Sequence, residues 1–97
     1  MAEQLTFEYD PRKATLNRRN HKGVTFDEAA TVFLGDPSAY TDFDSDHSAL
    51  DEQRFFTIGY SARGRLLYIV HNQEGSTIRL ISARLAEPPE RTLYEED

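Results

Sequence analysis

Residues 54–84 constrain the fold of this chain most strongly, because they read as three consecutive strands. Aliphatic and aromatic side chains that suit a pleated, half-buried surface fill this stretch, and glycine-containing breaks at residues 62–64 and 73–76 interrupt it. Returns as short as these join neighbouring strands in the antiparallel sense. The sequence therefore predicts a mostly antiparallel sheet in the second half of the chain.

A short strand and a first helix are expected before this sheet. Residues 5–9 alternate apolar and polar side chains, which is the period of a half-exposed strand. Asp10 is a favourable N-cap and Pro11 is tolerated in the first helical turn, so a helix is expected from Pro11 to about His21. This segment carries five of the eleven basic residues of the chain: Arg12, Lys13, Arg18, Arg19 and Lys22.

A second helix and an acidic segment follow. Thr25 and Glu28 have the spacing of a capping box, in which each side chain bonds to the backbone N–H of the other residue. The helix that begins there is expected to end near Gly35, before Pro37. Residues 36–53 contain six acids and no base until Arg54, and they are expected to form an acidic, mobile loop.

The expected order of elements is β-α-α-β-β-β-α, with a final helical turn or two near the C-terminus. A chain of 97 residues suits one small α+β domain that spans residues 1–97, with the two helices of its N-terminal half packed on the sheet. No apolar run approaches the ~20 residues of a membrane helix, and the N-terminus lacks the pattern of a signal peptide. We therefore expect a cytoplasmic protein that does not contact a membrane.

Several motifs of this chain resemble those of one family, and they occur in that family's order. They are F-E-Y-D-P-x-K at residues 7–13, N-x-x-x-H at 17–21, G-V-T-F-x-E-A at 23–29, G-R-L-L at 64–67, I-R-L-I-S-A-R at 78–84 and Y-E-E at 94–96. On these motifs the chain is similar to the BrnT ribonuclease toxins of bacterial type II toxin–antitoxin systems. It departs from the pattern in having Asn20 where a lysine is common, and in Lys22, which looks like a one-residue insertion before Gly23.

The resemblance implies a RelE-like fold and an endoribonuclease that cleaves RNA without a metal ion or other cofactor and arrests growth. It also implies a partner, a BrnA-like antitoxin with a ribbon-helix-helix DNA-binding domain, joined with the toxin in a heterotetramer. Through that antitoxin the complex would contact operator DNA and regulate its own operon. An alternative is a catalytically weak RelE-like binding module that serves mainly as antitoxin partner and co-repressor.

Metal-free RNA cleavage needs a group that transfers protons and groups that stabilise the charge on phosphorus. The imidazole of His21 suits the first task, and guanidinium groups suit the second because they are planar and always charged. Glu8 is expected either to act as a base or to orient an arginine. The candidates for catalysis are His21, Arg65, Arg79 and Glu8, and the candidates for RNA binding are Lys13, Lys22, Arg84 and Tyr60.

Two reservations apply to the arginines. Each of them can instead form a structural ion pair, which is common for arginine on a sheet. Strand alternation also sets Arg79 and Arg84 on opposite faces, unless the strand twists or bulges between them. Because the chain has no cysteine and no histidines or acids at zinc-ligand spacing, no metal site is expected.

Overall fold

The computed structural model describes residues 4–45 and 53–96. Its strands are β1 (Thr6–Glu8), β2 (Tyr40–Phe43), β3 (Phe55–Tyr60), β4 (Leu66–Glu74) and β5 (Thr77–Leu85). Its helices are α1 (Pro11–Asn20), α2 (Phe26–Gly35) and α3 (Pro88–Glu96). The strands form one sheet in the order β1-β5-β4-β3-β2, in which only the β1–β5 pair is parallel. The expected α+β class with a mostly antiparallel sheet is confirmed.

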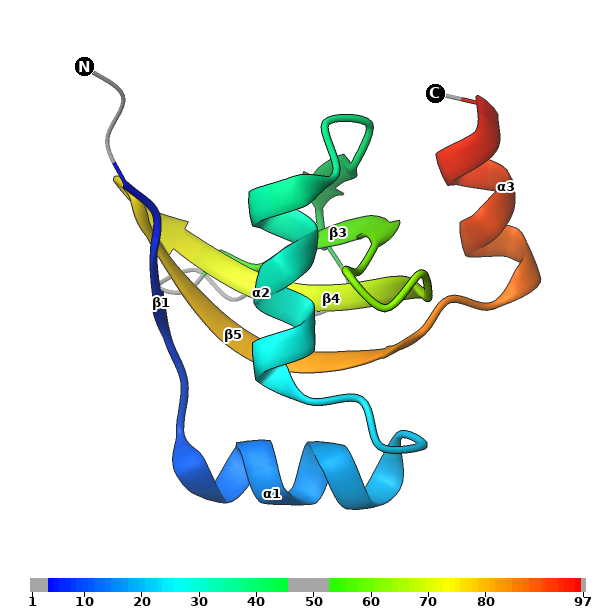
Figure 1. The fold of residues 1–97 in the computed structure, drawn as a ribbon. Helices are drawn as coiled ribbons and strands as arrows, with labels where there is room; N and C mark the ends of the chain where they lie inside the picture. The colour runs from blue at the N-terminus through cyan, green and yellow to red at the C-terminus, as the bar shows by residue number, and fades with distance from the viewer. Residues whose placement is uncertain (1–3, 46–52, 97) are drawn as a thin grey trace.

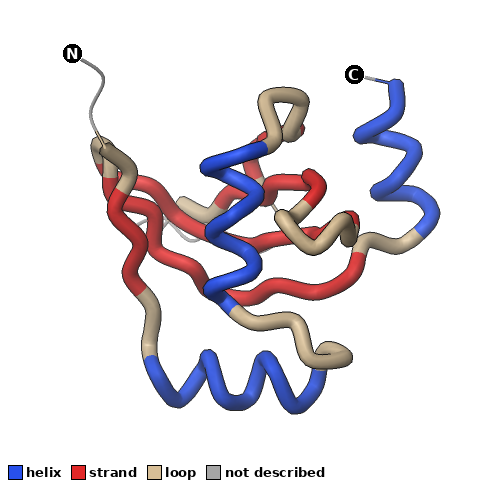
Figure 2. Tube along the Cα trace, viewed as in Figure 1, coloured by secondary structure: helices blue, strands red, loops and turns tan. Residues whose placement is uncertain are grey.

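Helices cover the sheet unevenly (Figures 1 and 2). α2 lies across one face of the sheet, α1 runs along its lower side, and α3 stands beyond the end of β5. The core lies between α2 and the sheet, and its buried members are Val24, Phe26, Ala29, Val32, Leu67, Ile69, Ile78, Leu80 and Ala83. We call the sheet surface that carries Leu67 and Ile69 the helix face, and the opposite surface, which carries Tyr68, the far face. None of the described helices is long and apolar enough to cross a membrane.

The segment expected to be an acidic loop contains an additional strand. Residues Tyr40–Phe43 form β2, which pairs with β3 at the edge of the sheet. The hydroxyls of Thr41 and Thr57 lie 2.7 Å apart across this pair. Tyrosine, threonine and phenylalanine favour strands, and the alternating acids concealed that signal in the sequence. Residues 46–52 of the expected loop lie outside the described residues.

The two predicted helix starts are confirmed, with one difference. The Asp10 carboxylate accepts a hydrogen bond from the Arg12 N–H at 2.9 Å, and the Thr25 hydroxyl accepts one from the Glu28 N–H at 3.0 Å. The reciprocal half of the capping box is absent, because the Glu28 carboxylate turns instead to Ser61 and Arg65. The Glu28 carboxylate therefore binds residues that are distant in the sequence instead of completing the local capping box.

A β-bulge in β5 decides which of its side chains share a face. Leu80 pairs with His71 and Ser82 pairs with Val70, so Ile81 has no partner across the strand pair. The extra residue reverses the alternation of side chains beyond it. As a result Arg79 and Arg84 lie on the same face, the far face, where they oppose Asn72 and Tyr68. The expectation from strict alternation, that they would lie on opposite faces, is corrected by this bulge.

We expect Gly59→Ala to destabilise the fold by about 1–3 kcal/mol, because it forces extra atoms into a packed site. A Cβ on Gly59 would lie 2.5 Å from Cγ1 of Val32 and 3.0 Å from Cβ of Ala39. Urea unfolding followed by circular dichroism measures the loss. Gly35→Ala is the matched control, since a Cβ there meets nothing within 4 Å. Equal stability of the two variants would contradict the close packing of β3 against α2.

His71 makes stability depend on pH. It is fully buried, and burial lowers the pKa of its imidazole from 6.5 to about 4. Its Nε2 lies 2.7 Å from the Thr57 hydroxyl, and its ring meets Phe33 edge-on at 5.0 Å. Below pH 6.5 the imidazole of His71 binds a proton in the unfolded chain, whereas in the folded chain it becomes protonated only at about pH 4. Proton binding by His71 therefore has no effect on stability at neutral pH, and it lowers the free energy of unfolding as the solution becomes acidic.

Between pH 6.5 and pH 4 we expect this group to remove about 3 kcal/mol from the free energy of unfolding, at about 1.4 kcal/mol for each pH unit. Urea unfolding at pH 7.5, 5.5 and 4.5 measures the slope. His71→Leu should lower the slope over this range, whatever its effect on stability at neutral pH. An unchanged slope in that variant would show that other groups cause the acid sensitivity.

Candidate active site at the end of helix α1

Asn17 fixes α1 against the sheet. Its side chain is buried in the middle of the helix, where its Nδ2 donates to the carbonyls of Ala83 at 2.7 Å and Val24 at 2.9 Å. Its Oδ1 accepts from the Ala83 N–H at 2.8 Å. β1 covers the outer edge of β5 only at residues 77–79, so the Asn17 carboxamide takes the place of a strand partner further along. This contact decides which part of α1 lies beside β5.

Helical spacing places two candidate residues, Lys13 and His21, on the side of Asn17, four residues before and four after it. With Leu16, Asn17 and Asn20 they line a hollow that also includes the bulge residues Ile81 and Ser82. The bulge and the end of α1 therefore meet at one place on the edge of β5.

A second hollow, of about 370 Å³, adjoins the first at His21. Asn20, His21 and Lys22 line one wall, and residues 84–88, which connect β5 to α3, line the other. The backbone turns sharply here, since Lys22 has φ of 53° and Gly23 has φ of 76°. This turn presents the Lys22 side chain beside His21. Lys22 thus lines the same hollow as Asn20, the other position at which the sequence was expected to depart from the family pattern.

The bases of this region have no acidic partner. The five bases are Arg12, Lys13, Arg18, Arg19 and Lys22. Within residues 4–45 and 53–96 none of them forms an ion pair, and the residues of α1 include no acid. All five side chains are exposed. An imidazole flanked by uncompensated cations can exchange protons next to a bound anion. The end of α1 therefore has the groups required to bind and cleave a phosphodiester.

Arg84 lies beside this group but already has a partner. Its guanidinium forms a two-pronged ion pair with the Glu90 carboxylate of α3, at 2.7 and 2.5 Å, and covers the Tyr68 ring at 4.3 Å from the ring centre. The other side of Tyr68 is stacked on Phe56. The ion pair with Glu90 raises the pKa of Arg84, so its charge is retained but neutralised. Tyr68 has neither ring face free to stack on a base.

Glu8 and Arg79 meet at the other end of β5. They are register partners on the parallel β1–β5 pair, and they line a depression with Asn72, Glu74 and Thr77. Within the described chain the Arg79 side chain forms no ion pair, and it is exposed. The β4 partners of Arg79 and Arg84 are Asn72 and Tyr68, which are four residues apart, so the backbone positions of the two arginines are about 13 Å apart along the strand. Arg84 is in addition held by Glu90, so in this structure the two guanidinium groups have different partners.

The structure places Arg65 away from both groups. On the helix-face side of the sheet, its Nε donates to the Glu28 carboxylate of α2 at 2.9 Å, and its Nη2 contacts the same carboxylate closely. That carboxylate is buried, and Arg65 lowers its pKa. This ion pair ties α2 to the turn before β4. Arg65 therefore has a structural partner where the sequence suggested a catalytic role.

Tyr60 shares the far face with Arg84, at the end of β3. Its ring meets that of Tyr94 edge-on at 5.4 Å, and its hydroxyl accepts a hydrogen bond from Arg91 at 3.3 Å. The Tyr94 hydroxyl in turn donates to Asp36 at 2.9 Å, and burial first and Asp36 second raise the pKa of Tyr94 to about 12. Tyr60 thus helps to dock α3 and remains 39 % exposed.

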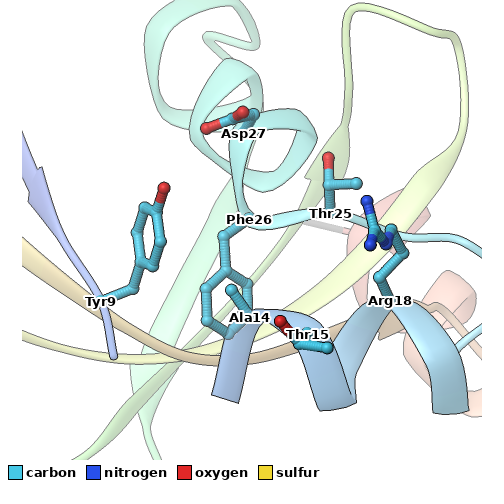
Figure 3. Close-up of a pocket in the computed structure, with 7 residues that line it drawn as sticks. All are labelled: Tyr9, Ala14, Thr15, Arg18, Thr25, Phe26 and Asp27. Carbon is cyan, nitrogen blue, oxygen red and sulfur yellow. The ribbon is translucent and has the colours of Figure 1, made fainter. Parts of the chain in front are cut away.

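A further hollow opens on the opposite flank of α1 (Figure 3). It lies between α1 and the start of α2 and is lined by Tyr9, Ala14, Thr15, Arg18, Thr25, Phe26 and Asp27. Tyr9 meets Phe26 edge-on at 5.5 Å. None of the eight residues suggested by the sequence lines this hollow. It has no group suited to proton transfer near neutral pH, so we do not place the active site there.

Comparison with known families identifies the chain. A family model described as the ribonuclease toxin BrnT of type II toxin–antitoxin systems matches residues 9–90. The chain belongs to the BrnT family. A search of curated proteins found no match. Among solved structures, the Brucella abortus ribonuclease toxin BrnT, determined at 1.1 Å resolution, is similar, with 24 % identity and a TM-score of 0.64 over 87 % of this chain and 99 % of that one.

This BrnT-family chain uses several residues that the site prediction missed. Asn17 was visible only as part of a motif, and its signal was a carboxamide in mid-helix, four residues before His21. Glu28 and Glu90 neutralise two of the three candidate arginines, and no local pattern pairs them with those arginines. Within the described ranges no three histidine, aspartate or glutamate side chains gather as metal ligands would.

We expect Arg65→Met to lower the free energy of unfolding by about 3 kcal/mol, because it leaves the buried Glu28 carboxylate without its cation. Urea unfolding measures the loss. Arg79→Met is the matched control and should change stability by less than about 0.5 kcal/mol, since its side chain is exposed. Adding Glu28→Gln to Arg65→Met should restore part of the loss. A stable Arg65→Met protein would contradict the structural role of this arginine.

Proposed function

We propose that this BrnT-family toxin cleaves RNA without a metal ion, at the end of α1. The observation that carries the proposal is the position of His21 between Lys13 and Lys22, in two adjoining hollows beside the bulge of β5. The family description, a ribonuclease toxin, supports the activity in general. Metal independence is supported by the donor set, an imidazole and amines, which suits acid–base catalysis on a phosphodiester.

The reaction requires no group beyond RNA and these side chains. The ribose 2′-OH attacks the adjacent phosphorus, and the bond from phosphorus to the 5′-oxygen breaks. The products are a 2′,3′-cyclic phosphate and a 5′-hydroxyl. His21 is the proposed proton-transfer residue, and Lys13 and Lys22 stabilise the extra negative charge on the phosphoryl oxygens. His21 accepts the 2′-proton as the 2′-oxygen attacks and then gives it to the departing 5′-oxygen as the bond to phosphorus breaks, so that one imidazole balances both proton transfers.

The remaining candidates have other places in this proposal. Arg79, with Glu8 beside it, provides a second contact for the RNA backbone at the other end of β5, about 13 Å along the strand from Arg84. Arg84 contributes charge to the wall of the hollow but is shared with Glu90. Tyr60 has an exposed ring edge at the same end of the sheet. Arg65 is left out, because its ion pair with Glu28 lies elsewhere.

A second candidate function is a catalytically weak binding module that acts mainly as antitoxin partner and co-repressor. Its supporting observation is that Arg65 and Arg84 are both neutralised within the chain. Only Arg79 among the three candidate arginines keeps an uncompensated charge in the described part of the structure. This reading predicts tight antitoxin binding with no RNA cleavage.

The proposal includes a cytoplasmic protein and a cognate BrnA-like antitoxin of the ribbon-helix-helix class, which together form a heterotetramer and repress their own operon. The family's membership of type II systems supports a protein antitoxin as partner. Light scattering on the co-expressed pair tests the stoichiometry, and a gel shift with operator DNA tests repression. A complex that contains no DNA-binding subunit would refute this part.

We expect purified protein to cleave RNA in excess chelator, and His21→Ala to reduce the rate by about 10²–10⁴-fold, the usual contribution of general acid–base catalysis. Lys22→Gln should reduce it about tenfold, through loss of a charged contact to phosphate. End-labelled RNA on a denaturing gel measures the rate and shows whether the 3′ end is a cyclic phosphate.

Two variants define what the result means. Arg63→Gln is the charge-matched control, because Arg63 is largely exposed and its guanidinium lies 3.7 Å from the Glu28 carboxylate of α2. The rate of this variant should equal that of the wild type. Arg79→Ala tests the second contact and should weaken RNA binding without removing cleavage. Cleavage that survives His21→Ala but not Arg79→Ala would move the active site to the Glu8–Arg79 end. No cleavage by the wild type would favour the binding module.

A further inference from the structure

One apolar side chain on the outer surface of α1 is out of keeping with its surroundings. Leu16 is 52 % exposed, on a helix whose inner side is anchored through Asn17. Helical spacing puts Arg12 and Lys13 one turn before it, and Arg19 and Asn20 one turn after it. All four neighbours are exposed. Leu16 is therefore an apolar centre beside three uncompensated cations, Arg12, Lys13 and Arg19, and the neutral Asn20, and we call this group the Leu16 patch.

We propose that the Leu16 patch is the docking site for an acidic, amphipathic segment of the protein antitoxin. This inference rests on the proposed function only in taking the partner to be an antitoxin. An exposed leucine adds nothing to the binding of a phosphate backbone, which is a charge interaction. An apolar anchor with a ring of cations instead suits a segment that has one apolar side chain flanked by carboxylates, since buried apolar centres with complementary charge at the rim are typical of specific protein interfaces.

The charge of the patch favours a separate acidic chain. α1 carries four bases and no acid, although the whole protein has a net charge of −6. Within the described residues no carboxylate of the chain itself pairs with these bases. Glu87, just before α3, and Glu90, within α3, both pair with Arg84. The cations of α1 thus remain available, and the attraction would also speed association with an acidic partner.

Docking there would also explain inhibition. Lys13 and Asn20 belong both to the ring around Leu16 and to the hollow beside His21. A segment seated on Leu16 would therefore cover the flank of α1 on which RNA is proposed to bind. The antitoxin would neutralise the toxin by occupying its cations, with no rearrangement of the fold.

The test compares Leu16→Gln with Leu34→Gln. Glutamine keeps the helix propensity of leucine, and Leu34 is an even more exposed leucine, at 67 %, on α2. The antitoxin encoded beside the toxin is immobilised, and the affinity and dissociation rate of each toxin variant are measured at low and high salt. We expect Leu16→Gln to weaken binding at least tenfold, Leu34→Gln to leave it unchanged, and salt to weaken the wild-type complex.

The outcomes are separable from those of the RNA assay. Antitoxin binding is measured without RNA, so the result for Leu16→Gln does not depend on its cleavage rate, and this matters because Leu16 itself lines the hollow beside His21. The antitoxin should inhibit this variant less than it inhibits the wild type. Equal antitoxin affinity of the two variants, or binding that is insensitive to salt, would overturn the docking proposal. If the wild type cleaves no RNA but Leu16→Gln still loses antitoxin affinity, the docking site stands and the proposed nuclease function fails.

Discussion

The position of the proposed active site depends on the hydrogen bonds of one buried side chain, Asn17. Its carboxamide binds the backbone N–H and C=O of Ala83 and so satisfies an edge of β5 that no strand covers. Because a buried, unpaired backbone group costs stability, this contact holds α1 in one rotation about its axis. That rotation places Lys13, His21 and the half-exposed Leu16 around the hollow at the bulge of β5.

The bulge at Ile81 is the second constraint, and it acts on the charges of the sheet. It sets Arg79 and Arg84 on one face, yet it leaves them about 13 Å apart, each with a different neighbour. Arg84 pairs with Glu90 and Arg65 pairs with Glu28, so most of the positive charge of the sheet stabilises the fold. The uncompensated charge lies on α1, and this shifts the proposed site from the sheet to the helix beside it.

One surface then accounts for both expected properties of a type II toxin. In this proposal the flank of α1 next to β5 contains the imidazole and amines for RNA, and Leu16 with the cations around it binds an acidic partner. The overlap at Lys13, Leu16 and Asn20 would make the two ligands compete. A chain with a net charge of −6 can thus bind a polyanion, because its acids are concentrated in other segments.

The sequence by itself determined the elements and their order, apart from the edge strand β2. Asp10 and Thr25 mark the helix starts, the glycine-containing turns mark the hairpins, and each signal acts over a few neighbouring residues. The family motifs also gave His21 and Lys13 as candidates, and the departure from them gave Lys22, although Asn17 received no role. Tertiary structure alone decided that β1 lies parallel beside β5 and that residues 40–43 form an edge strand. It also decided that a bulge places Arg79 and Arg84 on one face, and that Glu28 and Glu90 form ion pairs with Arg65 and Arg84. Those outcomes depend on contacts between segments far apart in the chain, where burial and charge pairing in three dimensions outweigh any local pattern.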